Sequence, residues 1–199
     1  MALMLGINSY ATVAEANQYF ADRLDVSAWT APSGATDATL ISDMQSDALV
    51  TASMYLDQFN FAGYATSWTQ NLSWPRTGAF FDRSRGRDIN FTSTYTFTEL
   101  DTSSSAAYLT AFAALPREIQ LLKKATYEQA HHFLANDGVL DTRSTTSSSS
   151  DRIRVGSIEI AGASASGSVA PPAITAITTT SFLRPLLVGG GSNIWYRAN

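Results

Sequence analysis

Cysteine is absent from the 199 residues, so disulfide bonds and cysteine-based zinc sites are excluded. Charged residues are scarce, at 15% of the chain, which suggests that much of the surface meets other protein rather than water. No segment reaches the 18 consecutive apolar residues of a membrane span, and the first residues lack the positive charge of a signal peptide. The sequence therefore predicts a soluble product that is not secreted and has no membrane partner.

Sequence patterns of catalysis are also absent. The chain has no GxxxxGK phosphate loop and no GxGxxG, and its GASASG stretch does not match the GxSxG nucleophile elbow. His131 and His132 are neighbours on one expected helix, so their side chains point about 100° apart instead of sharing a face for metal. We therefore expect no enzyme, no catalytic residue, no metal site and no cofactor.

Charge is unevenly distributed along a chain whose net charge is -4. The first 60 residues hold seven acidic residues and one arginine, whereas residues 143–199 hold five arginines and two acidic residues. The acidic N-terminal region and the basic C-terminal region can attract each other between identical subunits as well as within one subunit. Two solvated surfaces with no special relation are an equally good interpretation.

Capping signals and hydrophobic spacing predict the helices. Thr12 and Glu15 form a capping box for a helix that should reach Leu24. Asp37 should cap a longer helix, and Pro116 should open a third that ends near Asn136. The apolar stripe of the second helix is Leu40, Ile41, Met44, Ala48, Ala52, Tyr55, Leu56 and Phe59, and that of the third is Ile119, Leu122, Thr126, Ala130 and Phe133.

The fold class that follows is mainly α. We expect a small bundle of three or four helices, with a long loop or hairpin excursion at residues 79–115 that includes a short helix capped by Ser104. The domain organisation is then a helical domain at residues 1–138 and a flexible C-terminal arm at residues 139–199.

The stretch NLSWPRTG places Trp74, Pro75 and Arg76 at a corner after the second helix. Tryptophan side chains are usually largely buried, so we interpret Trp74 as a structural anchor, with Arg76 bonding nearby carbonyls or carboxylates. Contact with a partner is the alternative. The aromatic run from Phe59 to Trp74 could stack on bases, but it contains no Lys or Arg, which favours core packing.

Low-complexity Ser- and Gly-rich segments predict that the C-terminal arm contains one short strand, RIRVGSIEI, and one short helix. A lone strand must pair with another element, so we expect the arm to form an assembly interface with a neighbouring protein. Folding back onto its own helices is the alternative. The expected interface residues are Arg152, Ile153, Arg154, Val155, Ile158, Arg184, Ile194, Trp195, Tyr196 and Arg197.

Five segments and their order along the chain carry a family resemblance: SYATVAEANQYFADR, ALVTASMYLDQF, NLSWPRTG, LPREIQLLKKATYEQA and RVGSIEI with FLRPLL. Together they resemble the head-to-tail adaptor, or head-completion (neck), proteins of tailed bacteriophages, part of which is labelled DnaT-like single-stranded-DNA-binding protein. The excursion at residues 79–115 and the Ser-rich arm are longer than in that family.

The resemblance implies a structural virion protein that assembles in the host cytoplasm and sits in the neck, between head and tail. Copies would form a homo-oligomeric ring, usually twelve-fold, beneath the portal protein, and would offer a docking surface to stopper or tail proteins. Double-stranded DNA would pass through the lumen without being read during genome ejection. Arg83, Arg85 and Arg87 are the candidate lumen or loop contacts.

The alternative function is a single-stranded-DNA-binding protein of the replication type. Such a protein needs a basic groove with interleaved aromatic residues. The only basic cluster is Arg83, Arg85 and Arg87, and the neighbouring Asp82 and Asp88 offset most of its charge. A tail-terminator-like ring is a third hypothesis, which differs in being mainly β.

Overall fold

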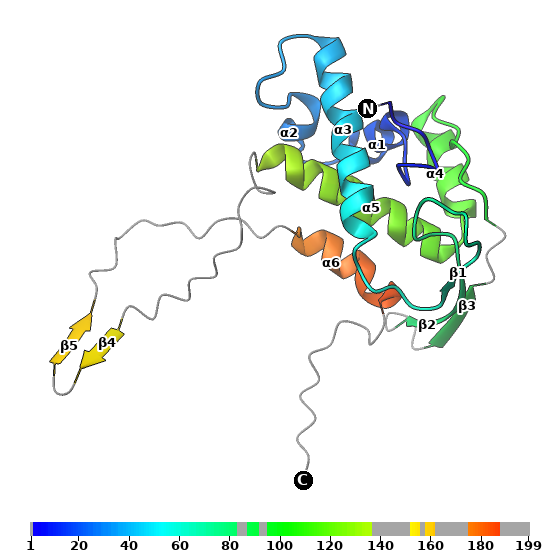
Figure 1. Ribbon diagram of the computed structural model, residues 1–199. Coiled ribbons are helices and arrows are strands. Elements are labelled where there is room, and N and C mark those ends of the chain that lie inside the picture. Colours follow the sequence, from blue (N-terminus) through cyan, green and yellow to red (C-terminus); the bar gives the residue numbers. More distant parts are fainter. Residues whose placement is uncertain are drawn as a thin grey trace. The chain divides into compact units, whose positions relative to one another are not determined.

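The computed structural model describes residues 2–82, 87–91, 95–136, 152–155, 158–161 and 175–187. For residues 79–82, 87–91, 152–155 and 158–161 it describes the backbone alone. The chain divides into two compact units (Figure 1). The first combines residues 1–135 with 175–199, and the second comprises residues 136–174.

The first unit is built from helices, which confirms the mainly α prediction. In chain order they are α1 (Val13–Phe20), α2 (Ser27–Thr30), α3 (Ala38–Leu56), α4 (Ser105–Ala114), α5 (Arg117–Ala135) and α6 (Ile177–Leu183), followed by the 3-10 turn η1 (Arg184–Leu186). Helices α2, α3 and α6 all pack against α5, which runs through the middle of the unit (Figure 1). No helix among the described residues is long and apolar enough to cross a membrane.

Three helix starts lie where the sequence predicts them. Thr12 and Glu15 close the capping box of α1, Asp37 accepts from Leu40 N at the start of α3, and Ser104 accepts from the third residue of α4. Helix α1 ends at Phe20, earlier than the expected Leu24, because the chain enters a turn at Ala21, whose N–H donates to Gln18 O. Asp25, further along, has a positive φ of 59°. Capping side chains therefore fixed the beginnings of the helices better than their ends.

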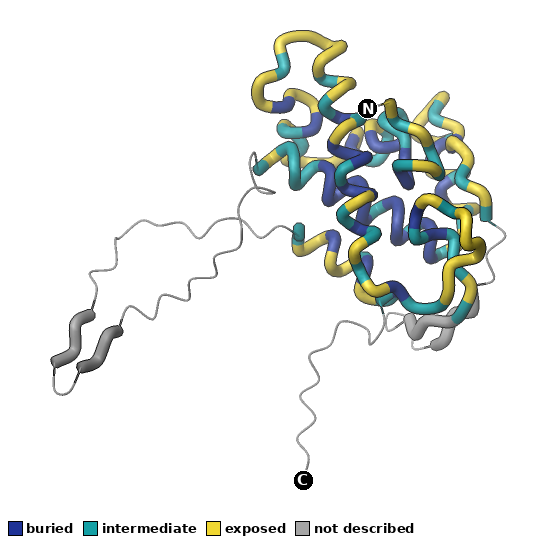
Figure 2. The backbone as a smooth tube through the Cα atoms, viewed as in Figure 1, coloured by how far each residue is buried: buried dark blue, intermediate teal, exposed yellow. Residues whose placement is uncertain are grey.

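The predicted stripe of α3 is most deeply buried toward its C-terminal end, and Ile41 and Met44 near its start are half-buried. Ala48, Ala52 and Leu56 are buried, whereas Leu40 is 37% exposed. Figure 2 shows exposed residues at the first turns of α3 and buried residues where α3 crosses α5. Those first turns project beyond the crossing, so an apolar side chain there has little to pack against.

Helix α5 is buried around most of its circumference. Its predicted face is confirmed at Ile119, Leu122, Thr126 and Ala130, and Phe133 is half-buried. Lys123, Tyr127 and Gln129 are buried as well. Both hydrophobic clusters of the unit contain α5 residues, so this helix joins them into one core.

Three short strands form an antiparallel sheet in the order β1 (Tyr64–Ala65), β2 (Arg76–Asp82) and β3 (Arg87–Phe91). Tyr64 pairs with Thr77, and Gly78 pairs with Phe91. The β2–β3 hairpin and α4 together occupy most of the predicted 79–115 excursion. Residues 95–100 then return to the core, where Leu100 is buried.

The predicted division at residue 138 is wrong for residues 175–187. Leu183 and Leu186 have no exposed surface and belong to the same apolar cluster as Leu122. Ala62 N also donates to Leu186 O at 2.8 Å. This burial makes α6 and η1 part of the helical unit, so the expected arm does not extend over the whole of residues 139–199.

The second unit contains a β-hairpin in place of the lone strand that was predicted. Strands β4 (Arg152–Val155) and β5 (Ile158–Ala161) pair antiparallel, with Ile153 opposite Ile160. The stretch RIRVGSIEI therefore supplies two strands that satisfy part of each other's backbone.

Candidate interaction surface

Residues 57–76 connect α3 to β2 and are called the corner loop below. Its backbone is tied across the loop at several points. Thr66 donates from its N–H and its hydroxyl to Pro75 O, at 3.2 and 3.0 Å. Gln70 accepts from Ser67 N at 3.0 Å and donates to Leu72 O at 2.8 Å. The loop is therefore held by bonds of its own and not only by its two ends.

Trp74 is the apolar anchor of the corner loop. It is 1% exposed, and its ring meets Phe61 edge to face with centroids 5.7 Å apart. Tyr10 and Leu122 lie in the same cluster, and the Trp74–Pro75 peptide bond is cis. Trp74 is thus buried, as expected for a structural anchor.

Arg76 closes the corner loop from within. Its guanidinium donates to the carbonyls of Gly63 at 2.6 Å, Ala62 at 2.9 Å, and Phe61 and Ser73 at 3.3 Å each. Burial lowers the pKa of Arg76, while nearby Tyr10 and Asp57 oppose that shift. The five donors of arginine suit several carbonyls at once, so this cation is engaged inside the loop.

Asp57 secures the start of the corner loop. It accepts from the hydroxyl of Tyr10 and from Ser73 N, the latter at 3.2 Å. Trp74 N in turn donates to the Tyr10 hydroxyl at 3.3 Å. Burial raises the pKa of Asp57, and the hydrogen bonds from Tyr10 and Ser73 only partly offset that effect.

Two aromatic side chains point away from this bonded interior. Trp68 is fully exposed and Tyr64 is 81% exposed. Core packing was the prediction for the whole aromatic run, and it is wrong for these two residues. Polar Thr66, Ser67 and Thr69 surround Trp68, a signal that could have placed it outside. The corner loop thus presents two exposed aromatic side chains on a backbone held by hydrogen bonds, which makes it a candidate contact surface for another molecule.

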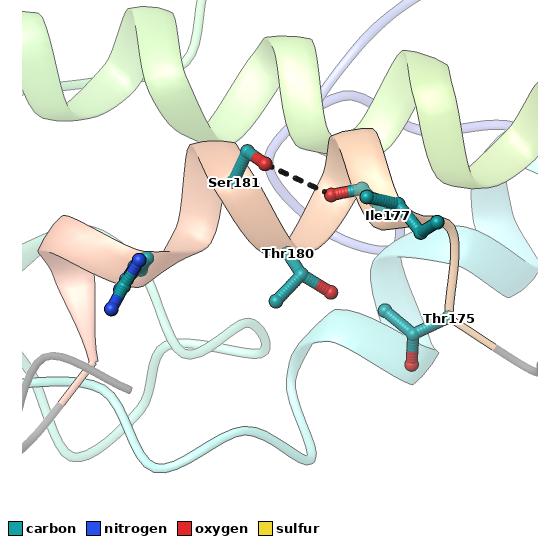
Figure 3. A pocket seen from close by; sticks show the side chains of 5 residues that line it. Thr175, Ile177, Thr180 and Ser181 are labelled. Atoms are coloured by element: carbon teal, nitrogen blue, oxygen red, sulfur yellow. Dashed lines mark hydrogen bonds between the residues drawn. The ribbon is translucent and has the colours of Figure 1, made fainter. Parts of the chain in front are cut away.

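A shallow hollow lies over the outer side of α6 (Figure 3). Its lining combines hydroxyl groups, one arginine and Ile177, which is 86% exposed. The Ser181 hydroxyl is already bonded to Ile177 O at 3.1 Å, as the dashed line shows. Such an open polar hollow suits contact with a surface better than enclosure of a small molecule. The lining residues are Thr175, Ile177, Thr180, Ser181 and Arg184.

A fully buried ion pair, which the sequence did not reveal, lies between α1 and α5. Lys123 Nζ lies 2.6 Å from Glu15 Oε2, and neither side chain is exposed. Glu15 also accepts from Thr12 N and Leu100 N, which ties the chain after β3 to α1. Burial lowers the pKa of Lys123, and the charge of Glu15 opposes the shift. Because the pair is enclosed, its role is to join α1, α5 and residue 100.

The histidines and acidic residues do not form a metal centre in the described part of the chain, where no three His, Asp or Glu side chains group suitably. His131 packs its ring against Phe20 with centroids 5.5 Å apart, and burial lowers its pKa.

The remaining predicted contact residues have different outcomes. Arg184 is exposed and lines the α6 hollow. Arg87 lies in β3, and Arg152, Ile153, Arg154, Val155 and Ile158 lie in the β4–β5 hairpin. Arg83, Arg85, Ile194, Trp195, Tyr196 and Arg197 lie outside the described residues.

The fold and the corner loop define a mainly helical protein with a candidate contact surface. A family model described as "Putative DnaT-like ssDNA binding protein" matches residues 3–90. This region contains α1 to α3, the corner loop and most of the β2–β3 hairpin, and it is less than half of the chain. No curated protein and no solved structure matches the chain.

Proposed function

We propose that the protein is a structural virion component, a head-to-tail connector adaptor that forms a ring beneath the portal of a tailed bacteriophage. In this role it sits in the neck, docks the tail or a stopper, and lets double-stranded DNA pass. The phage assignment rests on the ordered segments that resemble adaptor proteins. The proposal includes no catalytic activity and no cofactor.

The observation that carries the assembly part of this proposal is the chemistry of the corner loop. Trp68 and Tyr64 are exposed on a fixed backbone, which lowers the entropy cost of binding a partner. Residues 57–75 contain no Lys or Arg, and Arg76 is engaged by four carbonyls. An aromatic surface without cations fits a protein partner better than a phosphate backbone.

A second candidate function is single-stranded-DNA binding, which the description of the matching family model favours. Trp68 and Tyr64 lie inside the matched region, and exposed aromatic rings can stack on bases of any sequence. The net charge of -4 argues against it, because non-specific affinity comes from neutralising phosphates.

Two parallel binding experiments, one with each candidate partner, test the proposal. The protein is mixed with purified portal rings in one arm and with a fluorescent oligonucleotide in the other, both at about 150 mM salt. We expect it to sediment with the portal and to leave the oligonucleotide free, since non-specific affinities are roughly 10⁻⁴–10⁻⁶ M there. Submicromolar binding of the oligonucleotide without portal binding would replace the adaptor with the second function.

A further inference from the structure

The β4–β5 hairpin has two unlike faces. The register places Ile153 opposite Ile160 and Val155 opposite Ile158. Because successive residues of a strand alternate between faces, these four apolar residues share one face of the hairpin. The other face carries Arg152, Arg154, Glu159 and Ala161. A hairpin with one apolar face is typical of part of a larger sheet, in which that face is covered, and not of an isolated hairpin in water.

Such a hairpin is incomplete by itself. Among the described residues its sheet contains only β4 and β5, so each strand has one outer edge. Two-stranded hairpins are at best marginally stable in water, and their outer backbone groups are ready to pair with another strand. A third strand at either edge would extend the sheet.

The charges of the hairpin identify a suitable neighbour. Strand β4 carries Arg152 and Arg154, and β5 carries Glu159. When two copies lie side by side in antiparallel order, β5 of one copy meets β4 of the next. Within one hairpin Glu159 lies opposite Arg154. In the register that repeats this pair between copies, Glu159 of the first copy also lies opposite Arg154 of the second, and opposite charges on neighbouring strands stabilise a sheet. The same pairing recurs with every added copy.

We infer that the β4–β5 hairpins of adjacent copies join edge to edge, β5 of one beside β4 of the next, into a sheet that continues from copy to copy. This contact is heterologous, so it generates a ring when the rotation closes. The inference rests on the proposed adaptor function and names the contact that would hold its ring together.

The connecting segments are long enough for this arrangement. Fifteen residues separate Asn136 from Arg152, and thirteen separate Ala161 from Thr175. Thirteen extended residues span at most about 45 Å. A compact unit of this size has a radius of gyration of about 15 Å, so a hairpin can reach the adjoining copy.

Charge reversal in pairs of chains tests the contact. The variants are Arg154→Glu, Glu159→Arg and the double exchange, and native mass spectrometry counts the copies on purified portal rings. We expect each single variant to lose the complete ring, because like charges then meet at every contact. The double exchange should restore it. An equal mixture of the two single variants should restore it too, because each chain supplies the charge that the other lacks.

The outcomes separate this contact from the other roles of the hairpin. If the double exchange restores the ring and the mixture does not, the charges act only within one hairpin, and the inference is wrong. Complete rings from either single variant would also overturn it while leaving the adaptor function intact. If the parent chain itself fails to bind the portal, the proposed function fails. The helical circular dichroism spectrum serves as the folding control for all variants.

Discussion

Trp68 and Trp74 stand six residues apart in one loop, and they meet opposite surroundings. Trp74 is 1% exposed and packs on Phe61, whereas Trp68 is fully exposed and follows Ser67, whose N–H donates to the side chain of Gln70. The same side chain type therefore has two uses within a single loop. The buried ring fixes where the loop lies, and the exposed ring is left for a partner.

The polar groups of the corner loop also differ between its interior and its outer surface. Arg76 and Asp57 direct their bonds to the interior, toward carbonyls, Tyr10 and Ser73. The outer surface keeps neutral aromatic and hydroxyl groups. A surface that is rigid because of its inner bonds and free of charge outside is suited to a contact with protein.

The largest effect is expected from Trp74→Ala. Removal of a buried aromatic ring leaves a cavity and should lower the free energy of unfolding by about 3–5 kcal/mol. Urea denaturation followed by circular dichroism measures the loss. A variant as stable as the parent would show that the loop does not depend on its buried ring.

A smaller loss is expected from Arg76→Ala. Four carbonyls lose their donor, and half-buried carbonyls without a partner should cost about 1–3 kcal/mol of unfolding free energy. The matched variant Arg76→Lys keeps the charge and loses the planar fork, so it should restore only part of the loss. Full rescue by lysine would mean that charge, and not the fork of hydrogen bonds, holds the loop.

The pH dependence of stability isolates Asp57. Because its pKa is raised in the folded protein, the stabilisation from its bound proton is complete below the unfolded value and is lost as the pH rises through the folded value. Asp57→Asn does not titrate, and its amide oxygen can still accept from Tyr10 and Ser73. We expect the variant to gain stability relative to the parent as the pH rises above the ordinary aspartate pKa of about 4. Parallel stability curves would exclude this role for Asp57.

The smallest effect on stability, and a large one on assembly, is expected from Trp68→Ala. An exposed side chain should change the free energy of unfolding by no more than about 0.5 kcal/mol. As a central aromatic contact, its loss should cost at least about 2 kcal/mol of binding to the portal or to another copy. Thr69→Ala, one residue away, is the matched surface control. Normal binding by the Trp68 variant would remove the corner loop from the interface.

Local signals in the sequence were enough to predict the helix starts and the buried anchor. Thr12, Asp37 and Ser104 predict where their helices begin, because a capping side chain bonds to the backbone within four residues of itself. The orientation of Trp68 was missed because hydrophobicity and aromatic spacing do not say which side of a loop faces the core.

Long-range pairing explains the other errors. Lys123 and Glu15 lie 108 positions apart, and charged residues are usually exposed, so nothing local marked them as a buried pair. Helix α6 was assigned to a flexible arm because low-complexity segments precede it. Its docking on α5 depends on Leu183 and Leu186 filling the core, which is a property of the packed unit.

Oxidative footprinting of the tryptophans, with and without purified portal rings, tests the central claim most directly. Hydroxyl radicals should label Trp68 strongly in the free protein and weakly once the portal is bound, while Trp74 stays protected in both states. Mass spectrometry of the digested protein reads each site separately. Equal labelling of Trp68 in the free and portal-bound protein, or its protection by an oligonucleotide and not by the portal, would contradict the account.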